Sequence, residues 1–393
     1  NFRKITVSDF PRFREILFYA VVCFLQGRRV AAEIFSGQGP ALFLYSARTK
    51  YIYSMKKVIS LGEIMLRLSP ANDLRFLQTE CLDAVFGGSE ANVAVALSQL
   101  GQPAAFVTKL PDNVVGDMAL QVLRRYGVDT SAVIRGGKRL GIYFLEKGFS
   151  SCSSICTYDR AHSAIAEAKP EEFDWKRIFE EAGWFHFSGI TPALSDEAAE
   201  ICLQACRTAR ELGIGVSCDV NYRSKLWSMD KAREVVSEIG RYVDVAIVNE
   251  EEAAVLGADI RVDEAMNAEV YAQMAEQLNK KFDFGKIASV ARVPSENGLA
   301  VQGMLWDRSG ICCSRKYPLE SIVDPLGAGD AFAAALLYCF LKAEMAENQE
   351  TVEFASAACA LKHRIKGDYL LVKPADVLAL TDNVRGRVCG VQR

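Results

Sequence analysis

From Lys57 onward, short apolar runs alternate with stretches whose apolar residues recur at helical spacing. The runs predict core strands at residues 58–61, 104–109, 184–188, 215–219, 245–249 and 287–292. The stretches between them predict helices that include residues 90–100, 116–126, 196–212 and 250–256. Ser195 is the expected N-cap of the third helix, and Gly213 is its expected stop. This order predicts an α/β fold with a central, mostly parallel sheet and helices on both faces.

Two segments break this rhythm, at residues 66–86 and 142–160. Their polar and apolar residues alternate, which is typical of strands in a sheet with one exposed face. We expect them to meet as a small β-sheet lid over one edge of the main domain. Such a lid could close over a bound ligand and exclude water.

The first 54 residues carry one short apolar patch, at 16–25, which is too short to span a bilayer. A signal peptide is the alternative, but no small-residue cleavage site leads into the first strand. Met55 reads like a natural start. We therefore expect residues 1–54 to be an extension outside the fold and residues 55–385 to form the folded domain.

Composition narrows the class of protein. Half of the 393 residues are apolar, enough to bury one large core or two modest ones. The net charge of −3, without a basic run, argues against a nucleic-acid partner. Twelve cysteines without a CxxC pair, and only three histidines, argue against a zinc site. Reduced thiols in a cytoplasmic protein with no membrane partner are the simplest account.

The segment Asp324-Pro-Leu-Gly-Ala-Gly-Asp330 precedes an alanine-rich run that predicts a buried helix. A glycine turn at a helix N-terminus presents backbone N–H groups to an anion. Asp330 could then take a proton from a hydroxyl while these groups hold a phosphate. A loop that only starts a helix is an equally good interpretation of this segment alone.

Two further segments place polar groups where helices begin. In Gly87-Gly88-Ser-Glu-Ala-Asn92, the glycines permit close approach of a ligand and Asn92 could bind a hydroxyl, although a turn with an N-cap also accounts for the pattern. Asn249 to Glu252 follow a buried strand, at the strand end where α/β sheets bind ligands. Their oxygens could bind Mg²⁺ through water near ATP phosphates, while helix capping is the competing interpretation.

Arg223 follows the strand at 215–219, and Arg160 lies on the expected lid. Either arginine alone is more often a solvated surface residue. Together, near a strand-end cleft, they suggest a substrate that carries a carboxylate. The sequence contains neither a GxxxxGK[ST] loop nor a strand-linked GxGxxG pattern, so a bound ATP would use glycine-loop amides.

These motifs, in the order Gly62-Glu63, GGSEAN, Asn249/Glu252 and GAGD, resemble the ribokinase-like (PfkB) carbohydrate kinases from Lys57 to about residue 380. The segments GEIMLRL, DVNYRSKLW and KHRIKGD are most similar to 2-dehydro-3-deoxygluconate kinases. The resemblance implies ATP-dependent phosphorylation of 2-keto-3-deoxygluconate to 2-keto-3-deoxy-6-phosphogluconate. A fructokinase or another PfkB sugar kinase is the first alternative, and a non-catalytic sugar-binding regulatory protein is the second.

The resemblance also implies residue roles. Asp330 would be the general base, and the amides of Gly327, Ala328 and Gly329 would form the anion hole. The implied sugar contacts are Gly88, Asn92, Tyr143, Tyr158, Arg160, Arg223 and Asp330, with the arginines at the keto-acid end. Asn249 and Glu252 would organise Mg²⁺ through water, and Gly298, Gly327 and Gly329 would contact ATP. A monovalent cation is left open, and the lid would form a homo-oligomer interface.

Three positions depart from the family pattern. Residues 291–298 lack the Lys-x-Gly-x-x-Gly pattern found beside the nucleotide in many relatives. Pro325-Leu326 replaces the more usual Thr-Val or Arg-Val pair. His162 stands where glycine is common, so we expect a stiffer lid there.

Overall fold

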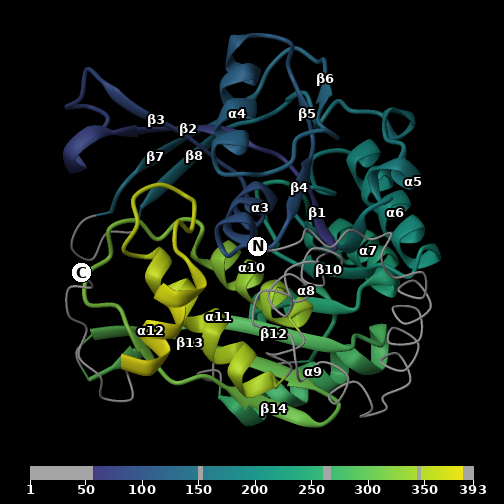
Figure 1. The fold of residues 1–393 in the computed structure, drawn as a ribbon, viewed down its shortest axis with the longest axis vertical. Helices are drawn as coiled ribbons and strands as arrows, with labels where there is room; N and C mark the ends of the chain where they lie inside the picture. The colour runs from purple at the N-terminus through teal and green to yellow at the C-terminus, as the bar shows by residue number, and fades with distance from the viewer. Residues whose placement is uncertain (1–55, 149–153, 260–266, 297, 343–346, 384–393) are drawn as a thin grey trace, which may run out of the picture. The chain divides into compact units, whose positions relative to one another are not determined.

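The apolar runs form the strands of one large sheet (Figure 1). The computed structural model describes residues 56–148, 154–259, 267–296, 298–342 and 347–383. The interpretation of residues 1–54 as an extension, and the domain end at 385, lie outside this range.

Within this range the large sheet has nine strands, ordered β14-β13-β12-β11-β10-β9-β1-β4, with β15 beside β13. Neighbours from β4 to β12 in this order are parallel, whereas β13 pairs antiparallel with β12, β14 and β15. The mostly parallel sheet is thus confirmed. Its strands are β1 (Lys57–Leu61), β4 (Ala104–Val107), β9 (Ala182–Ser188), β10 (Gly215–Asp219), β11 (Val245–Ile247), β12 (Lys286–Ser295), β13 (Gly298–Asp307), β14 (Gly310–Cys313) and β15 (Tyr317–Pro318).

Helices cover both faces of this sheet, as expected. Val58 of β1 packs into one core and the next residue, Ile59, into the other, because successive side chains of a strand point to opposite faces. The first core includes residues of α3 (Ser89–Gln99), α4 (Val114–Arg125), α10 (Ala328–Leu341), α11 (Asn348–Lys362) and α12 (Pro374–Asn383). The second includes residues of α5 (Trp175–Ile178), α6 (Asp196–Glu211), α7 (Met229–Ile239), α8 (Glu250–Val255) and α9 (Ala268–Phe282). None of the helices in the described ranges is long and apolar enough to cross a membrane.

Element boundaries follow the local signals. The Ser195 hydroxyl accepts the N–H of Ala198 at 3.1 Å, and Gly213 has a φ of 67°, so both predicted ends of α6 are confirmed. The predicted strand at 104–109 is divided, because β5 (Lys109–Leu110) pairs with β6 (Ile134–Arg135) in a separate two-stranded sheet. The strand predicted at 245–249 ends at Ile247.

The two segments with alternating polarity, predicted at residues 66–86 and 142–160, form a separate four-stranded sheet ordered β3-β2-β7-β8. It consists of β2 (Met65–Pro70), β3 (Leu82–Gly87), β7 (Gly141–Glu146) and β8 (Ile155–Asp159), and it extends to the upper left in Figure 1. The central pair, β2 and β7, is parallel, and the outer pairs are antiparallel. The small sheet is therefore confirmed, while its closure as a lid stays a prediction. Just beyond β8, His162 has a φ of 57°, a left-handed conformation that favours glycine.

Candidate active site

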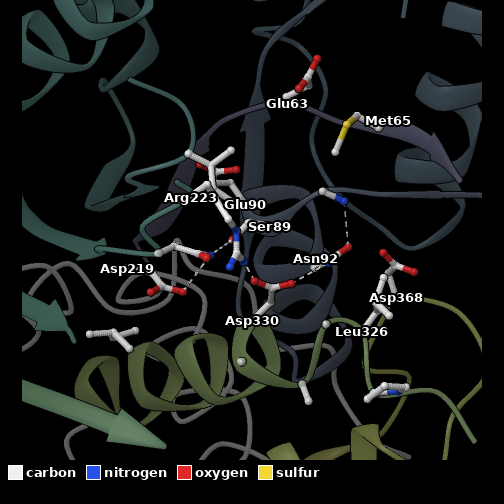
Figure 2. Close-up of a pocket in the computed structure, with 18 of the residues that line it drawn as sticks. Glu63, Met65, Ser89, Glu90, Asn92, Asp219, Arg223, Leu326, Asp330 and Asp368 are labelled. Carbon is white, nitrogen blue, oxygen red and sulfur yellow. Dashed lines mark hydrogen bonds between the residues drawn. The ribbon is translucent and has the colours of Figure 1, made fainter. Parts of the chain in front are cut away.

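A cavity of about 400 Å³ opens where strands of the large sheet end and the small sheet begins. Parallel strands place their carboxyl ends at one edge, and the first turns of α3 and α10 meet there (Figure 2). Twelve of the thirteen predicted site residues line this cavity. They are Gly88, Asn92, Tyr143, Tyr158, Arg160, Arg223, Asn249, Glu252, Gly327, Ala328, Gly329 and Asp330.

Gly298 is the exception. It begins β13 opposite Ser295, at the tip of the β12–β13 hairpin, and is not among the residues that line the cavity. Its contact with a nucleotide stays a prediction.

Asp330 is held by two donors from α3. Its carboxylate accepts a hydrogen bond from the Ser89 hydroxyl at 2.8 Å and another from Asn92 Nδ2 at 2.6 Å (Figure 2). The backbone N–H of Gly88 donates to Asn92 Oδ1 at 3.2 Å, which fixes the orientation of the amide. Burial raises the pKa of Asp330, and the two hydrogen bonds oppose that rise. Asp330 is thus an oriented carboxylate whose pKa lies above its usual value, as suits a general base.

The glycine loop ends in the first turn of α10. Gly327 caps the helix with a φ of 78°, and a Cβ there would lie 1.9 Å from the carbonyl oxygen of Asp368. The first N–H groups of a helix have no partner within the helix. A Cβ added at Gly329 would meet nothing within 4 Å, so open space lies beside this turn. The loop therefore has the geometry of an anion site.

The glycine pair at the start of α3 is required by close packing. Gly88 is the N-cap of α3, and a Cβ there would lie 1.9 Å from the carbonyl oxygen of Glu63. The interpretation as a turn with an N-cap is therefore confirmed. The same turn lines the cavity, and its contact with a ligand stays a prediction.

Asn249 and Glu252 form a capping box on α8. Asn249 Oδ1 accepts the N–H of Glu252 at 2.9 Å, and Glu252 Oε2 accepts the N–H of Asn249 at 2.8 Å. The capping interpretation is therefore confirmed, although both residues also line the cavity. Burial raises the pKa of Glu252 to about 7, and it raises that of Asp219 with a contribution from the Glu252 charge.

Oxygen ligands beside one another suit a hard cation such as Mg²⁺, which would relieve the repulsion between these carboxylates. In the chain as described, no group of three or more histidine, cysteine, aspartate or glutamate side chains could hold a metal ion. This donor set therefore fits a cation held through water and ligand phosphates.

The two cavity arginines differ in their partners. Arg160 donates to Glu63 Oε2 through Nε at 2.8 Å and also through Nη2, and its guanidinium lies 5.5 Å from the Tyr158 ring centre. Arg223 has no ion-pair partner within the described ranges, and its charge opposes the rise that burial causes in the pKa of Asp219 and of Asp330. Arg223 is thus available to an anionic ligand, whereas the positive charge of Arg160 is already balanced by the carboxylate of Glu63.

Several cavity residues were not predicted from the sequence. Glu63 is 3% exposed, and its Oε1 is buried without a hydrogen-bond partner among described groups. Asp368 accepts a hydrogen bond from the Tyr143 hydroxyl and lines the cavity. Both residues belong to sequence segments that carry the family resemblance. The segments were recognised, but neither residue was assigned a role in the site. Ser89, inside GGSEAN, was missed in the same way.

Comparison with known proteins shows the family of this chain. The model of the pfkB family carbohydrate kinases matches residues 55–372. The chain belongs to this family. It is therefore a carbohydrate kinase, with a sugar and ATP as small-molecule ligands, and the predicted family and ribokinase-like fold are confirmed.

Relatives of this kinase act on related sugars. It is 33% identical to a 2-dehydro-3-deoxygalactonokinase of Haloferax volcanii, over 86% of this chain and 99% of the relative. A solved 2-dehydro-3-deoxygluconokinase from Thermotoga maritima is 45% identical, with a TM-score of 0.79, and the match covers 83% of this chain and 98% of that structure. The kinase is also 28% identical to Fructokinase-1 of Zea mays, over 83% of this chain and 97% of the relative.

Proposed function

We propose that this kinase transfers the γ-phosphoryl group of ATP to the primary hydroxyl of 2-keto-3-deoxygluconate, giving 2-keto-3-deoxy-6-phosphogluconate. The observation that carries the proposal is Arg223, a cavity arginine without an ion-pair partner among described residues, beside the carboxylate of Asp330. An acidic sugar can form the direct ion pair that Arg223 does not make with described residues, whereas a neutral sugar cannot. The two relatives that act on keto-deoxy sugar acids support the same substrate class.

In this proposal Asp330 takes the proton of the C6 hydroxyl. As the new bond between that oxygen and the γ-phosphorus forms, the bond from the γ-phosphorus to the bridging oxygen of ADP breaks. Ser89 and Asn92 orient the carboxylate through the hydrogen bonds already described. Phosphoryl transfer needs positioning and charge stabilisation rather than covalent chemistry, and these groups supply the positioning.

The amides of Gly327, Ala328 and Gly329 form the anion hole for the phosphoryl group in transfer. Asn249 and Glu252, with Asp219 beside them, would hold Mg²⁺ through water, and a bound Mg²⁺ neutralises phosphate oxygens. Tyr143, Tyr158 and Arg160 contact the sugar from the lid side, and Arg223 binds its carboxylate.

The test is release of ADP with Mg-ATP and a panel of sugars: 2-keto-3-deoxygluconate, 2-keto-3-deoxygalactonate, fructose, ribose and gluconate. We expect the keto-deoxy acids to be preferred, and phosphorus NMR to place the phosphate on C6. Asp330→Asn should lower kcat by about 100- to 10,000-fold, because a positioned base contributes that much. Asp196→Asn is the matched control, since Asp196 also lies in the first turn of a helix but its side chain is 87% exposed.

A preference for fructose over both acids would refute the substrate and support the fructokinase alternative, which the maize relative represents. Full activity of Asp330→Asn would refute the base. Silence on every sugar, with ATP binding intact, would leave a sugar-binding regulatory protein as the better account.

Assembly and location complete the proposal. The small sheet exposes the apolar side chains of Leu82 and Ile155, and the segment between β2 and β3 exposes Leu77. We propose that a second copy of the chain covers them to form a homo-oligomer. Light scattering after Ile155→Glu should then show a smaller particle than the parent kinase, and an unchanged mass would contradict the interface.

A cytoplasmic location agrees with the buried free thiols of Cys202, Cys206 and Cys218.

A further inference from the structure

Four buried charged side chains lie in or pack against the glycine loop at residues 324–330. Arg67 is 3% exposed, Lys362 and Asp324 are 0% exposed, and Asp368 is 4% exposed. They come from β2 of the small sheet, the end of α11, the segment before α10 and the segment after α11. Two positive and two negative charges balance within this set, which we call the charge cluster.

Arg67 joins the small sheet to the segments that frame the glycine loop. Its Nη2 donates to Asp324 Oδ2 at 2.7 Å, its Nη1 donates to Asp368 Oδ1 at 2.6 Å, and its Nε donates to Ser69 Oγ at 3.0 Å. A buried arginine is tolerated only when its donors are satisfied in this way. The planar guanidinium of arginine presents its N–H donors to the two carboxylates in a fixed geometry, which the single nitrogen of a lysine ammonium does not reproduce.

The two carboxylates in turn fix the backbone of the loop. Asp324 Oδ1 accepts the N–H of Leu326 at 3.2 Å, and Oδ2 accepts the N–H of Gly367 at 3.1 Å. The carbonyl oxygen of Asp368 lies where a side chain at Gly327 would be, so the two backbones are in close contact. A shift of either carboxylate therefore moves the amides of the anion hole.

Lys362 contributes a cation at the same place. Its Nζ donates to the backbone carbonyls of Asp324 and Ile365, each at 3.1 Å. Backbone carbonyls beside a carboxylate are the ligands that hard cations take from proteins. The lysine thus brings a covalently attached cation to a position that would otherwise suit a dissolved one. Burial lowers the pKa of Lys362, and the charges of Asp324 and Asp368 oppose this.

We propose that Lys362 and Arg67 are positioning residues for phosphoryl transfer: internal cations that hold the anion-hole loop in place, so that turnover requires no dissolved monovalent cation. The proposal rests on the proposed function only for the anion hole, not for the identity of the sugar. Arg67 also links the loop to the small sheet, because Arg67 belongs to β2 and its guanidinium binds the carboxylates of Asp324 and Asp368. A movement of the small sheet would therefore also move the anion-hole loop.

The first experiment measures turnover of the parent kinase with the best sugar of the panel, in chloride salts of K⁺, Na⁺ and choline at equal ionic strength. We expect the same kcat in all three. Strong stimulation by K⁺ over choline would overturn the proposal. The assay uses whichever sugar of the panel is turned over best, so it does not depend on the proposed substrate. A wrong substrate shows in the sugar panel, whereas a wrong role for the charge cluster shows as stimulation by K⁺.

The second experiment uses Lys362→Ala and Arg67→Lys. We expect Lys362→Ala to lower kcat by about 100-fold, the cost of a misplaced reacting group, with a much smaller change in sugar KM. Ammonium or K⁺ should restore part of the lost kcat, because either can occupy the vacated position, whereas choline is too large. Arg67→Lys should lower kcat without rescue by ammonium.

Lys286→Ala and Arg315→Lys are the matched controls, since these part-buried cations pair with Asp307 and Glu353 away from the cavity. Unaltered kcat in Lys362→Ala, or a folded Lys362→Ala whose loss no small cation restores, would overturn the role of Lys362. If Lys362→Ala does not fold, the salt series on the parent kinase still decides.

Discussion

The carboxylate of Glu63 holds the guanidinium of Arg160 in a buried ion pair, with Glu63 Oε2 2.8 Å from Arg160 Nε. The second oxygen, Oε1, faces no hydrogen-bond partner among the described residues. The positive charge of Arg160 is therefore balanced before any acidic sugar enters. Under the proposed function, recognition of the sugar carboxylate then falls mainly to Arg223, and we expect Glu63 to limit how strongly the cavity attracts anions.

Glu63→Gln should therefore sharpen the preference for acidic sugars. Removing the carboxylate charge leaves Arg160 unbalanced, so we expect KM for the keto-deoxy acid to fall by roughly tenfold, equivalent to about 1.4 kcal/mol, relative to KM for a neutral sugar. Steady-state kinetics on both sugars measures this. Glu146→Gln is the control, because Glu146 at the end of β7 also pairs with an arginine, Arg75, but does not line the cavity. An equal rise of both KM values would instead mean that Glu63 binds a sugar hydroxyl.

Arg223→Ala should have the opposite selectivity. Loss of a charged hydrogen-bond donor weakens the acid sugar, and we expect its kcat/KM to fall by about 10- to 100-fold, with a much smaller fall for a neutral sugar. Arg139→Ala provides the comparison, since Arg139 pairs with Asp159 on the small sheet, outside the cavity. If the acid sugar is turned over as well as before, the keto-acid substrate is wrong.

Asn92→Leu should change the pH dependence of turnover. As the proposed general base, Asp330 must be ionised, and Asn92 is one of the two donors that stabilise its carboxylate. Removing the amide should therefore raise a pKa that burial already raises. The acidic limb of the profile of kcat/KM should therefore move to higher pH. Ser89→Ala should shift it in the same direction. A uniform loss of activity without a shift would mean that Asn92 acts on the sugar alone.

Glu252→Gln should make the unliganded kinase more stable at alkaline pH. Burial raises the pKa of Glu252 from an ordinary 4.5 to about 7, so the folded state holds this proton after the unfolded state has released it. The free energy of unfolding must therefore fall as pH rises between these values. At pH 8 we expect the variant to gain on the order of 2 kcal/mol over the parent, and at pH 4 nothing.

Urea titrations at the two pH values measure the difference. The glutamine can still accept the N–H of Asn249, so the capping box is preserved. A variant that is less stable at both pH values would show that the charge of Glu252 is compensated in the unliganded kinase.

Most of the fold could be predicted because its signals are local. The strand β1 is a short, mostly apolar run, and α6 has a serine cap and a glycine stop that fix its ends. The small sheet was predictable from the change to alternating polarity. The division of residues 104–109 between β4 and β5 was not, because it depends on pairing with Ile134–Arg135, which local pattern does not reveal.

The site was predictable where a motif carries its own chemistry, as at Asp330 and Gly327. Partners that become neighbours only through the fold were missed. Arg67 lies on a strand expected to have one exposed face, yet it is buried against Asp324 and Asp368. Nothing in the sequence around Glu63 indicates that Arg160 is its partner.

The contact between Arg67 and Asp368 spans 301 residues of sequence, and that between Tyr143 and Asp368 spans 225. Every strand of both sheets precedes residue 319, so during synthesis the sheets can form while these partners are still absent. A nascent or truncated chain that ends before Asp368 would bury Arg67 with only part of its countercharge, which is strongly unfavourable. We therefore expect completion of the cavity to be a late event in biogenesis, after nearly the whole domain has left the ribosome.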